Sequence, residues 1–180
     1  MQIAKTLLAP VHLQKPEMEQ LARQVSAEAD AFASLLALMG SEEPELAARA
    51  AWCFSHAAKL RPDWTREHQK AVVDILEKPA LPKGVLRNTL RILRDTQLHP
   101  DRFDKLAYHC FNFVEDPAQP VAIRAFALHI LGQIGCHIAD IRPEVKAIIE
   151  YHFAGGAPGL KSSAKAVLRL WRKMEAQSGR

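Results

Sequence analysis

Histidine and cysteine are the side chains here whose types suit a metal ion. His109 is followed directly by Cys110, and Cys136 is followed directly by His137. Neighbouring residues of a helix point about 100° apart, so neither pair can easily share an ion. The chain has no CxxC or HExxH spacing. The sequence therefore predicts no metal site and no cofactor.

Motifs for nucleophilic catalysis or phosphate binding are also missing, because no glycine-rich phosphate loop and no GxSxG turn occurs. The acidic residue weighed for catalysis is Asp63, beside Trp64. Asp63 follows Pro62 at the start of an expected helix, where a carboxylate faces the positive end of the helix dipole. This position explains Asp63 without an active site. We expect no enzyme, and no small-molecule substrate is evident.

Clustered cations offer a different chemistry, namely the attraction of acidic groups. Two expected helices carry basic residues at helical spacing on one side: Lys83, Arg87, Arg91 and Arg94 in the first, and Lys161, Lys165, Arg169 and Arg172 in the second. Such stripes attract acidic protein segments, phosphate or nucleic acid. The other interpretation is that these residues only keep an exposed helix face soluble.

Trp52 lies on the polar side of its expected helix, together with Arg49 and His56. A tryptophan in such a place can stack on a ligand or take an anchor residue. A partly buried Trp52 that packs against residues 1–27 is the alternative. The contact surface predicted from the sequence consists of Arg49, Trp52, His56, Arg87, Arg91 and Arg94, with Lys83, Lys161, Lys165 and Arg169 as further contacts for an acidic ligand or nucleic acid.

Prolines mark the helices that must position these side chains. One series, with steps of 38 residues, consists of Pro44, Pro82, Pro120 and Pro158. A second series, in which an acidic residue follows each proline, consists of Pro62, Pro100 and Pro143. Proline has no backbone N–H and suits the first turn of a helix. Each period therefore predicts two helices.

The first helix of each pair is expected over about residues 28–40, 63–78, 101–116 and 144–154. The second is expected over about residues 44–60, 82–98, 120–138 and 158–174, so the third copy is a turn longer. A helix over residues 16–25 belongs to an N-terminal cap, residues 1–27. The repeats cover about residues 28–61, 62–99, 100–142 and 143–175, and residues 176–180 form a disordered tail.

Two segments carry a resemblance to a known family. FASLLALMGSEEPELAARAAWCFSHAAKL, residues 32–60, resembles a HEAT or armadillo repeat, and VAIRAFALHILGQIG, residues 121–135, resembles the second helix of a HEAT unit. The resemblance covers about residues 28–175. It implies an all-α, right-handed superhelix (solenoid) of about four HEAT-like pairs, with the second helices on its concave side.

The resemblance implies a non-catalytic binding module or scaffold, and the basic stripes favour an acidic protein or peptide as partner. Peptide-binding armadillo repeats pair a tryptophan with an asparagine one turn later, but here His56 takes that place and Leu90 stands at the equivalent of Trp52. A nucleic-acid-binding protein is the alternative, because HEAT-like alkylpurine DNA glycosylases use a basic cleft with tryptophans and a catalytic aspartate. Asp63 and the tryptophans do not match that motif.

Composition limits the remaining classes. The 180 residues are 48% hydrophobic and 24% charged, and no window approaches the roughly 20 apolar residues of a membrane span. The N-terminus lacks the apolar core of a signal peptide, so we expect a cytoplasmic protein. Three cysteines, an odd number, favour buried thiols over disulfides. The four segments of the expected second helices, residues 44–61, 82–97, 120–142 and 158–175, carry net charges of +2, +3, +1 and +4. Since the whole chain carries +4, the other residues together carry −6, and the positive charge is concentrated on these helices.

Overall fold

The fold was analysed in a computed structural model that describes residues 3–9, 13–153 and 155–178. These residues form helices and the turns between them, and no β-strand occurs among them. The all-α repeat fold predicted from the sequence is thereby confirmed. The chain divides into two compact units, Met1–Gln97 and Leu98–Arg180, which are described separately.

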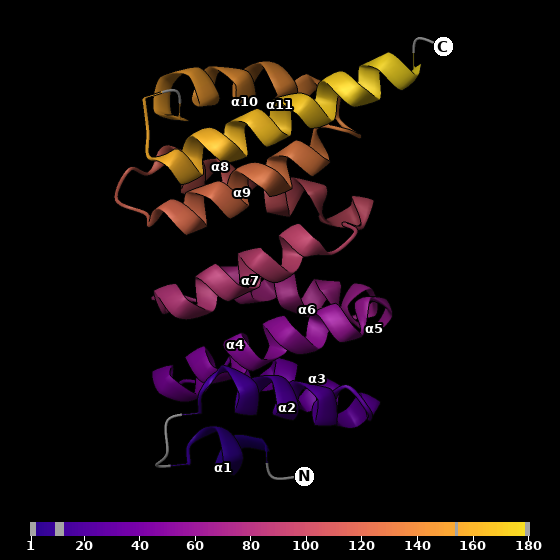
Figure 1. Cartoon of the computed structure of the whole chain (residues 1–180), viewed down its shortest axis with the longest axis vertical. Coiled ribbons are helices and arrows are strands. Elements are labelled where there is room, and N and C mark those ends of the chain that lie inside the picture. Colours follow the sequence, from indigo (N-terminus) through magenta and orange to yellow (C-terminus); the bar gives the residue numbers. More distant parts are fainter. Residues whose placement is uncertain (1–2, 10–12, 154, 179–180) are drawn as a thin grey trace. The chain divides into compact units, whose positions relative to one another are not determined.

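Unit 1 consists of two helical layers (Figure 1). The second-helix layer contains α4, which packs against α2 on one side and against α7 on the other. The first-helix layer contains α3, α5 and α6. The elements are α1 (Ile3–Leu7), α2 (Lys15–Val25), α3 (Ala29–Leu38), α4 (Pro44–Leu60), α5 (Pro62–Glu67), α6 (Gln69–Asp74), η1 (Ile75–Glu77) and α7 (Lys83–Asp95).

Helix starts in unit 1 follow the prolines. Pro44 and Pro62 are the first residues of α4 and α5, and Pro82 directly precedes α7. The single helix expected over residues 63–78 is instead divided at His68 into α5 and α6, and it ends in the 3-10 turn η1. The His68 ring stacks on Phe32 of α3, with the ring centroids 6.1 Å apart, so the break holds an aromatic side chain against the neighbouring helix.

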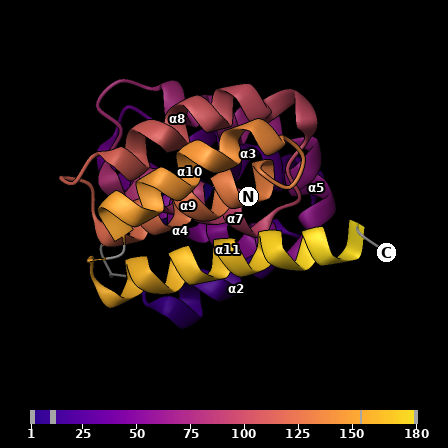
Figure 2. The same cartoon turned by 90° about the horizontal axis from the view of Figure 1, so that it is seen from above.

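In unit 2, α9 packs between α8 and α11 (Figure 2). Seen from above, α8 and α10 lie on one side of this unit and α11 lies on the other. The elements are η2 (Pro100–Arg102), α8 (Phe103–Glu115), α9 (Val121–Ile134), η3 (Ala139–Ile141), α10 (Arg142–Ile148), the π-helical turn η4 (Ile149–Phe153) and α11 (Pro158–Ser178).

The end of α9 differs from the expectation, because this helix stops at Ile134 rather than near residue 138. Two carbonyls at this end accept hydrogen bonds from side chains of other helices. The Gly132 carbonyl accepts a hydrogen bond from Trp171 Nε1 at 2.8 Å, and the Gly135 carbonyl accepts one from Arg142 Nε at 2.6 Å. Residues 135–137 form a tight turn after α9, with backbone bonds from Cys136 and His137 to Gln133 and Ile134, so the expected long third copy was wrong.

The C-terminal helix also differs from the expectation. α11 continues through Ser178, into the segment expected to be a tail, because Glu175, Ala176 and Gln177 are good helix formers. Residues 179–180, the rest of that segment, lie outside the described residues, as do residues 1–2 and 10–12 of the expected cap.

The core of unit 2 contains an arginine. Arg124 of α9 is 7% exposed and donates from Nε and Nη2 to the Val114 carbonyl at 3.0 and 2.8 Å. Val114 lies in the last turn of α8, where unpaired carbonyls give the helix its negative end. The guanidinium also lies 5.2 Å from the centre of the Phe153 ring. Arg124 is therefore a structural link between two helices of one repeat.

None of the helices that the structure describes is long and apolar enough to cross a membrane.

Candidate binding surface

The basic stripe expected in residues 82–98 lies on the side of α7 opposite its core residues. Lys83 and Arg87 are exposed and Arg91 is half-buried. We call these three residues the basic patch. The core side of α7 consists of Val85, Leu86, Thr89, Leu90, Ile92 and Leu93.

The basic patch has no internal counter-charge. No acidic residue of α7 precedes Asp95, and among the described residues no carboxylate lies within ion-pair distance of the three patch side chains. Arg94, the fourth residue of the stripe, differs because it donates from Nε and Nη2 to the two Asp95 oxygens at 2.6 and 2.9 Å. The charge of Arg94 is thus compensated within the unit.

His56 lies next to the basic patch on the neighbouring helix α4. Its side chain is 14% exposed, and its Nδ1 lies 3.8 Å from a Glu19 oxygen of α2. Its buried Nε2 has no hydrogen-bond partner among the described residues. Burial lowers the pKa of His56, and the positive charge of Arg91 lowers it further. His56 is therefore neutral at pH 7, and the arginines supply the charge of this surface.

Trp52 is half-buried, so part of its side chain is covered and part is exposed. Its ring meets the His56 ring edge-on, with the centroids 6.3 Å apart. Leu90, at the equivalent position of α7, is fully buried. The repeated tryptophans that line a peptide groove in armadillo proteins therefore have no counterpart on α7, and Trp52 is the single tryptophan of α4 and α7.

Arg49 occupies a structural position. Its Nη1 donates to the Leu7 carbonyl at 2.6 Å and lies 3.4 Å from the Ala9 carbonyl, while its Nη2 lies 2.5 Å from a Glu45 oxygen. Leu7 is the last residue of α1. Arg49 therefore ties α1 to α4, and the part of its side chain left for a partner is small, since only 16% is exposed.

The second basic stripe lies on α11 in unit 2. Lys161, Lys165, Arg169 and Arg172 are all exposed. Trp171, on the other side of α11, is 2% exposed and donates its indole N–H to α9. The second basic stripe therefore lies on the exposed side of α11, and the opposite side of this helix packs against α9.

The pair weighed for catalysis lies at the start of α5. Asp63 accepts from Arg61 Nη2 at 2.8 Å, and this bond lowers the pKa of the Asp63 carboxyl. The Arg61 guanidinium lies 3.1 Å above the Trp64 ring, which meets Phe32 edge-on. Ion pairing, cation–π contact and aromatic packing account for these residues. No group of three potential metal ligands occurs in the described part of the chain.

The sequence reasoning missed Lys78, whose ammonium donates to the Gly40 carbonyl. The signal was present, since the two residues are 38 positions apart, one repeat period. Gly40 and Lys78 therefore occupy equivalent positions in the interhelical turns of two successive repeats.

Comparison with protein families gives a match to the HEAT repeat domain over residues 4–170. The matched segment includes α2, which the sequence reasoning treated as part of a cap. Neither the search of curated proteins nor that of solved structures found a match. HEAT repeats generally mediate protein interactions and are typically non-catalytic. Together with the paired helices of both units, the match shows that the chain belongs to the HEAT repeat domain family.

Proposed function

We propose that this HEAT repeat protein is a non-catalytic module that binds an acidic protein or peptide segment through the basic patch on α7. The observation that carries the proposal is the contrast among the cations of α4 and α7. Arg49 and Arg94 have carboxylate partners, whereas Lys83, Arg87 and Arg91 have none among the described residues.

The spacing of the patch suits a carboxylate-bearing chain. Its members are four residues apart, so they lie one helical turn, about 6 Å, from each other along α7. Guanidinium groups bind carboxylates through two parallel hydrogen bonds, which favours Arg87 and Arg91 as the main contacts. The uncompensated charge also raises the association rate with an acidic partner.

Trp52 extends the surface beyond charge. A half-buried indole offers a large apolar area at a small entropic cost, which is typical of anchor positions in interfaces. We assign Arg87, Arg91 and Trp52 to the contact surface. His56 supports Trp52 from beside it, and Arg49 holds α1 in place.

The proposal is tested with a fluorescein-labelled peptide of twelve residues that alternates Glu with small residues and contains one Leu. Anisotropy at low salt reports its binding to the full chain. The double variant Arg87→Glu, Arg91→Glu should bind at least about tenfold more weakly, because two attractive contacts become repulsive. Arg66→Glu is the control. This residue is exposed on α5 in the first-helix layer, and its variant should bind the peptide within about twofold of the original.

A charge-only effect has a different signature. Equal weakening by Arg87→Glu alone and by the control, each of which exchanges one charge, would show that net charge alone governs binding. Absence of binding to the original protein would refute the acidic-peptide proposal.

Nucleic-acid binding is the second candidate, favoured by the exposed stripe of Lys161, Lys165 and Arg169 on α11. Labelled single- and double-stranded DNA measure it in the same assay. A logarithmic salt dependence with a slope of about −3 or steeper, lost in the triple Glu variant of this stripe, would support nucleic acid as the partner.

A further inference from the structure

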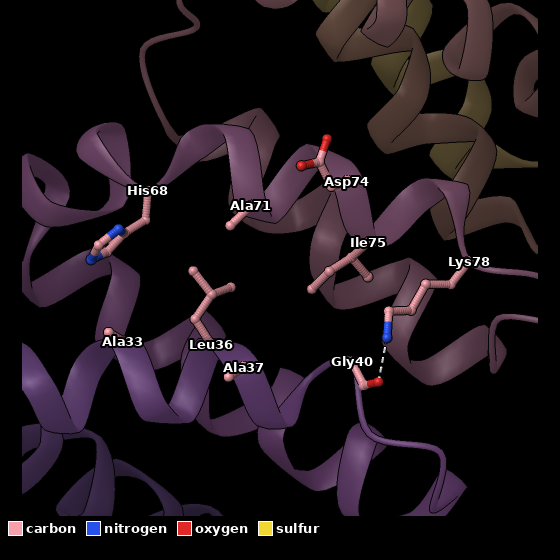
Figure 3. A pocket seen from close by; sticks show the side chains of 9 residues that line it. All are labelled: Ala33, Leu36, Ala37, Gly40, His68, Ala71, Asp74, Ile75 and Lys78. Atoms are coloured by element: carbon pink, nitrogen blue, oxygen red, sulfur yellow. Dashed lines mark hydrogen bonds between the residues drawn. The ribbon is translucent and has the colours of Figure 1, made fainter.

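A hollow of about 380 Å³ opens on the first-helix layer of unit 1, between α3 and the α6–η1 segment (Figure 3). Its walls are apolar and mostly small: Ala33, Leu36 and Ala37 from α3, and Ala71 and Ile75 from the opposite segment. His68, Asp74 and Lys78 supply the polar groups at its edges. Such a size and lining are common for sites that bind small ligands.

Lys78 closes one end of this hollow. Figure 3 shows its side chain reaching from the end of η1 to the Gly40 carbonyl, which accepts a hydrogen bond from the ammonium. A Cβ atom at position 40 would lie 2.7 Å from Nζ, so glycine permits this approach. A second hollow of about 460 Å³, formed by the turns around residues 39–44 and 78–82, begins on the other side of Lys78.

The charges around the first hollow leave one cation without a counter-ion. Asp74 lies 2.6 Å from Lys70 Nζ in an ion pair, and His68 is stacked on Phe32. Lys78 has a single hydrogen bond among the described residues, and its acceptor is an uncharged carbonyl. Glu42 lines the second hollow and disfavours an anionic group there. An acidic headgroup is therefore best placed at Lys78 with its apolar part in the first hollow.

We propose that this hollow binds an aliphatic carboxylate, a free fatty acid of medium chain length. The chain lies along Ala33, Ala37 and Ala71, and the carboxylate takes the place of the Gly40 carbonyl at the Lys78 ammonium. A charged acceptor forms a stronger hydrogen bond with an ammonium than an uncharged carbonyl does. Each buried methylene adds apolar stabilisation. The site lies in the layer opposite the basic patch and does not depend on it.

Decanoate and decanol, both below their aggregation concentrations, are the two probes for the full chain with ¹³C-labelled alanine methyl groups. Decanoate should shift the methyl signals of Ala33, Ala37 and Ala71 saturably. Decanol should bind about tenfold more weakly, because it lacks the charge that pairs with Lys78.

Two variants and one control separate the contributions of charge and cavity. Lys78→Met keeps the apolar stem and should weaken decanoate about tenfold while leaving decanol unchanged. Ala37→Leu fills the hollow from an exposed helical position and should weaken both ligands. Lys15→Met, on α2, removes an exposed charge elsewhere and should change neither.

Three results would overturn the proposal: no saturable shift of the three alanine methyl signals with decanoate, equal affinity for decanol and decanoate, or unchanged decanoate affinity in Lys78→Met. A circular dichroism spectrum identical to that of the original chain establishes that each variant is folded.

Discussion

Replacing Arg49 by methionine tests whether this residue is a structural link or a partner contact. Methionine keeps an apolar side chain at this position of α4 but removes the donors that reach the Leu7 and Ala9 carbonyls. The bond to Leu7, at 2.6 Å, is short and comes from a charged donor that is 16% exposed. Such a bond contributes about 1.5–3 kcal/mol, while the longer contact to Ala9 and the ion pair with half-exposed Glu45 add less.

We expect Arg49→Met to lower the free energy of unfolding by about 2 kcal/mol, measured by urea denaturation. The variant should also open locally, around α1. Amide hydrogens of residues 3–9 should exchange faster with solvent in the variant, because α1 loses its attachment to α4. Affinity for the acidic peptide should stay within about twofold of the original value.

The opposite pattern would refute this reasoning. Unchanged urea stability and unchanged exchange in residues 3–9, combined with lost peptide binding, would show that Arg49 acts as a partner contact instead.

Three further predictions concern packing, thiols and pH. Gly132→Ala should lower the free energy of unfolding by about 1 kcal/mol in calorimetry, because the new Cβ would lie 2.8 Å from a methyl group of Val167 on α11. This overpacking outweighs the better helix propensity of alanine. Gly84→Ala should instead raise the free energy of unfolding, since its nearest contact lies at 3.7 Å. Burial raises the pKa of Cys53 to about 12, so iodoacetamide at pH 8 should modify half-buried Cys136 first, and mass spectrometry that finds Cys53 modified first would contradict this order. The folded-state pKa of His56 lies below its usual 6.5, so the unfolded chain binds the proton more readily and stability should fall as the pH drops below 6.5; His56→Gln should reduce this slope in urea titrations at pH 5 to 7, and an identical slope would speak against it.

Helix starts were predictable because proline acts locally. Pro82 directly precedes α7 and Pro158 begins α11, and the basic stripes on these two helices follow from helical periodicity alone. The end of α9 was not predictable in this way. One of its contacts comes from Trp171, which lies 39 positions from the carbonyl that it binds.

The residues of the candidate surface were also predictable only in part. Periodicity placed Arg87 and Arg91 on one side of α7, because that depends only on the helix. It could not separate them from Arg49, whose partners at Leu7 and Ala9 lie 42 and 40 positions away. Tertiary packing determines which cations have counter-ions. The contact surface proposed with the structure therefore contains fewer residues than the surface predicted from the sequence.

The tryptophan indole and arginine side-chain signals of the ¹⁵N-labelled chain test the central claim most directly, because they report where the acidic peptide binds. We expect the Trp52 indole and the Nε signals of Arg87 and Arg91 to shift together on titration. The indole of buried Trp171 and that of Trp64, which is covered by Arg61, should stay in place. Shifts confined to Arg169 and Arg172 of α11, with Trp52, Arg87 and Arg91 unchanged, would contradict the assignment of the binding surface to the basic patch.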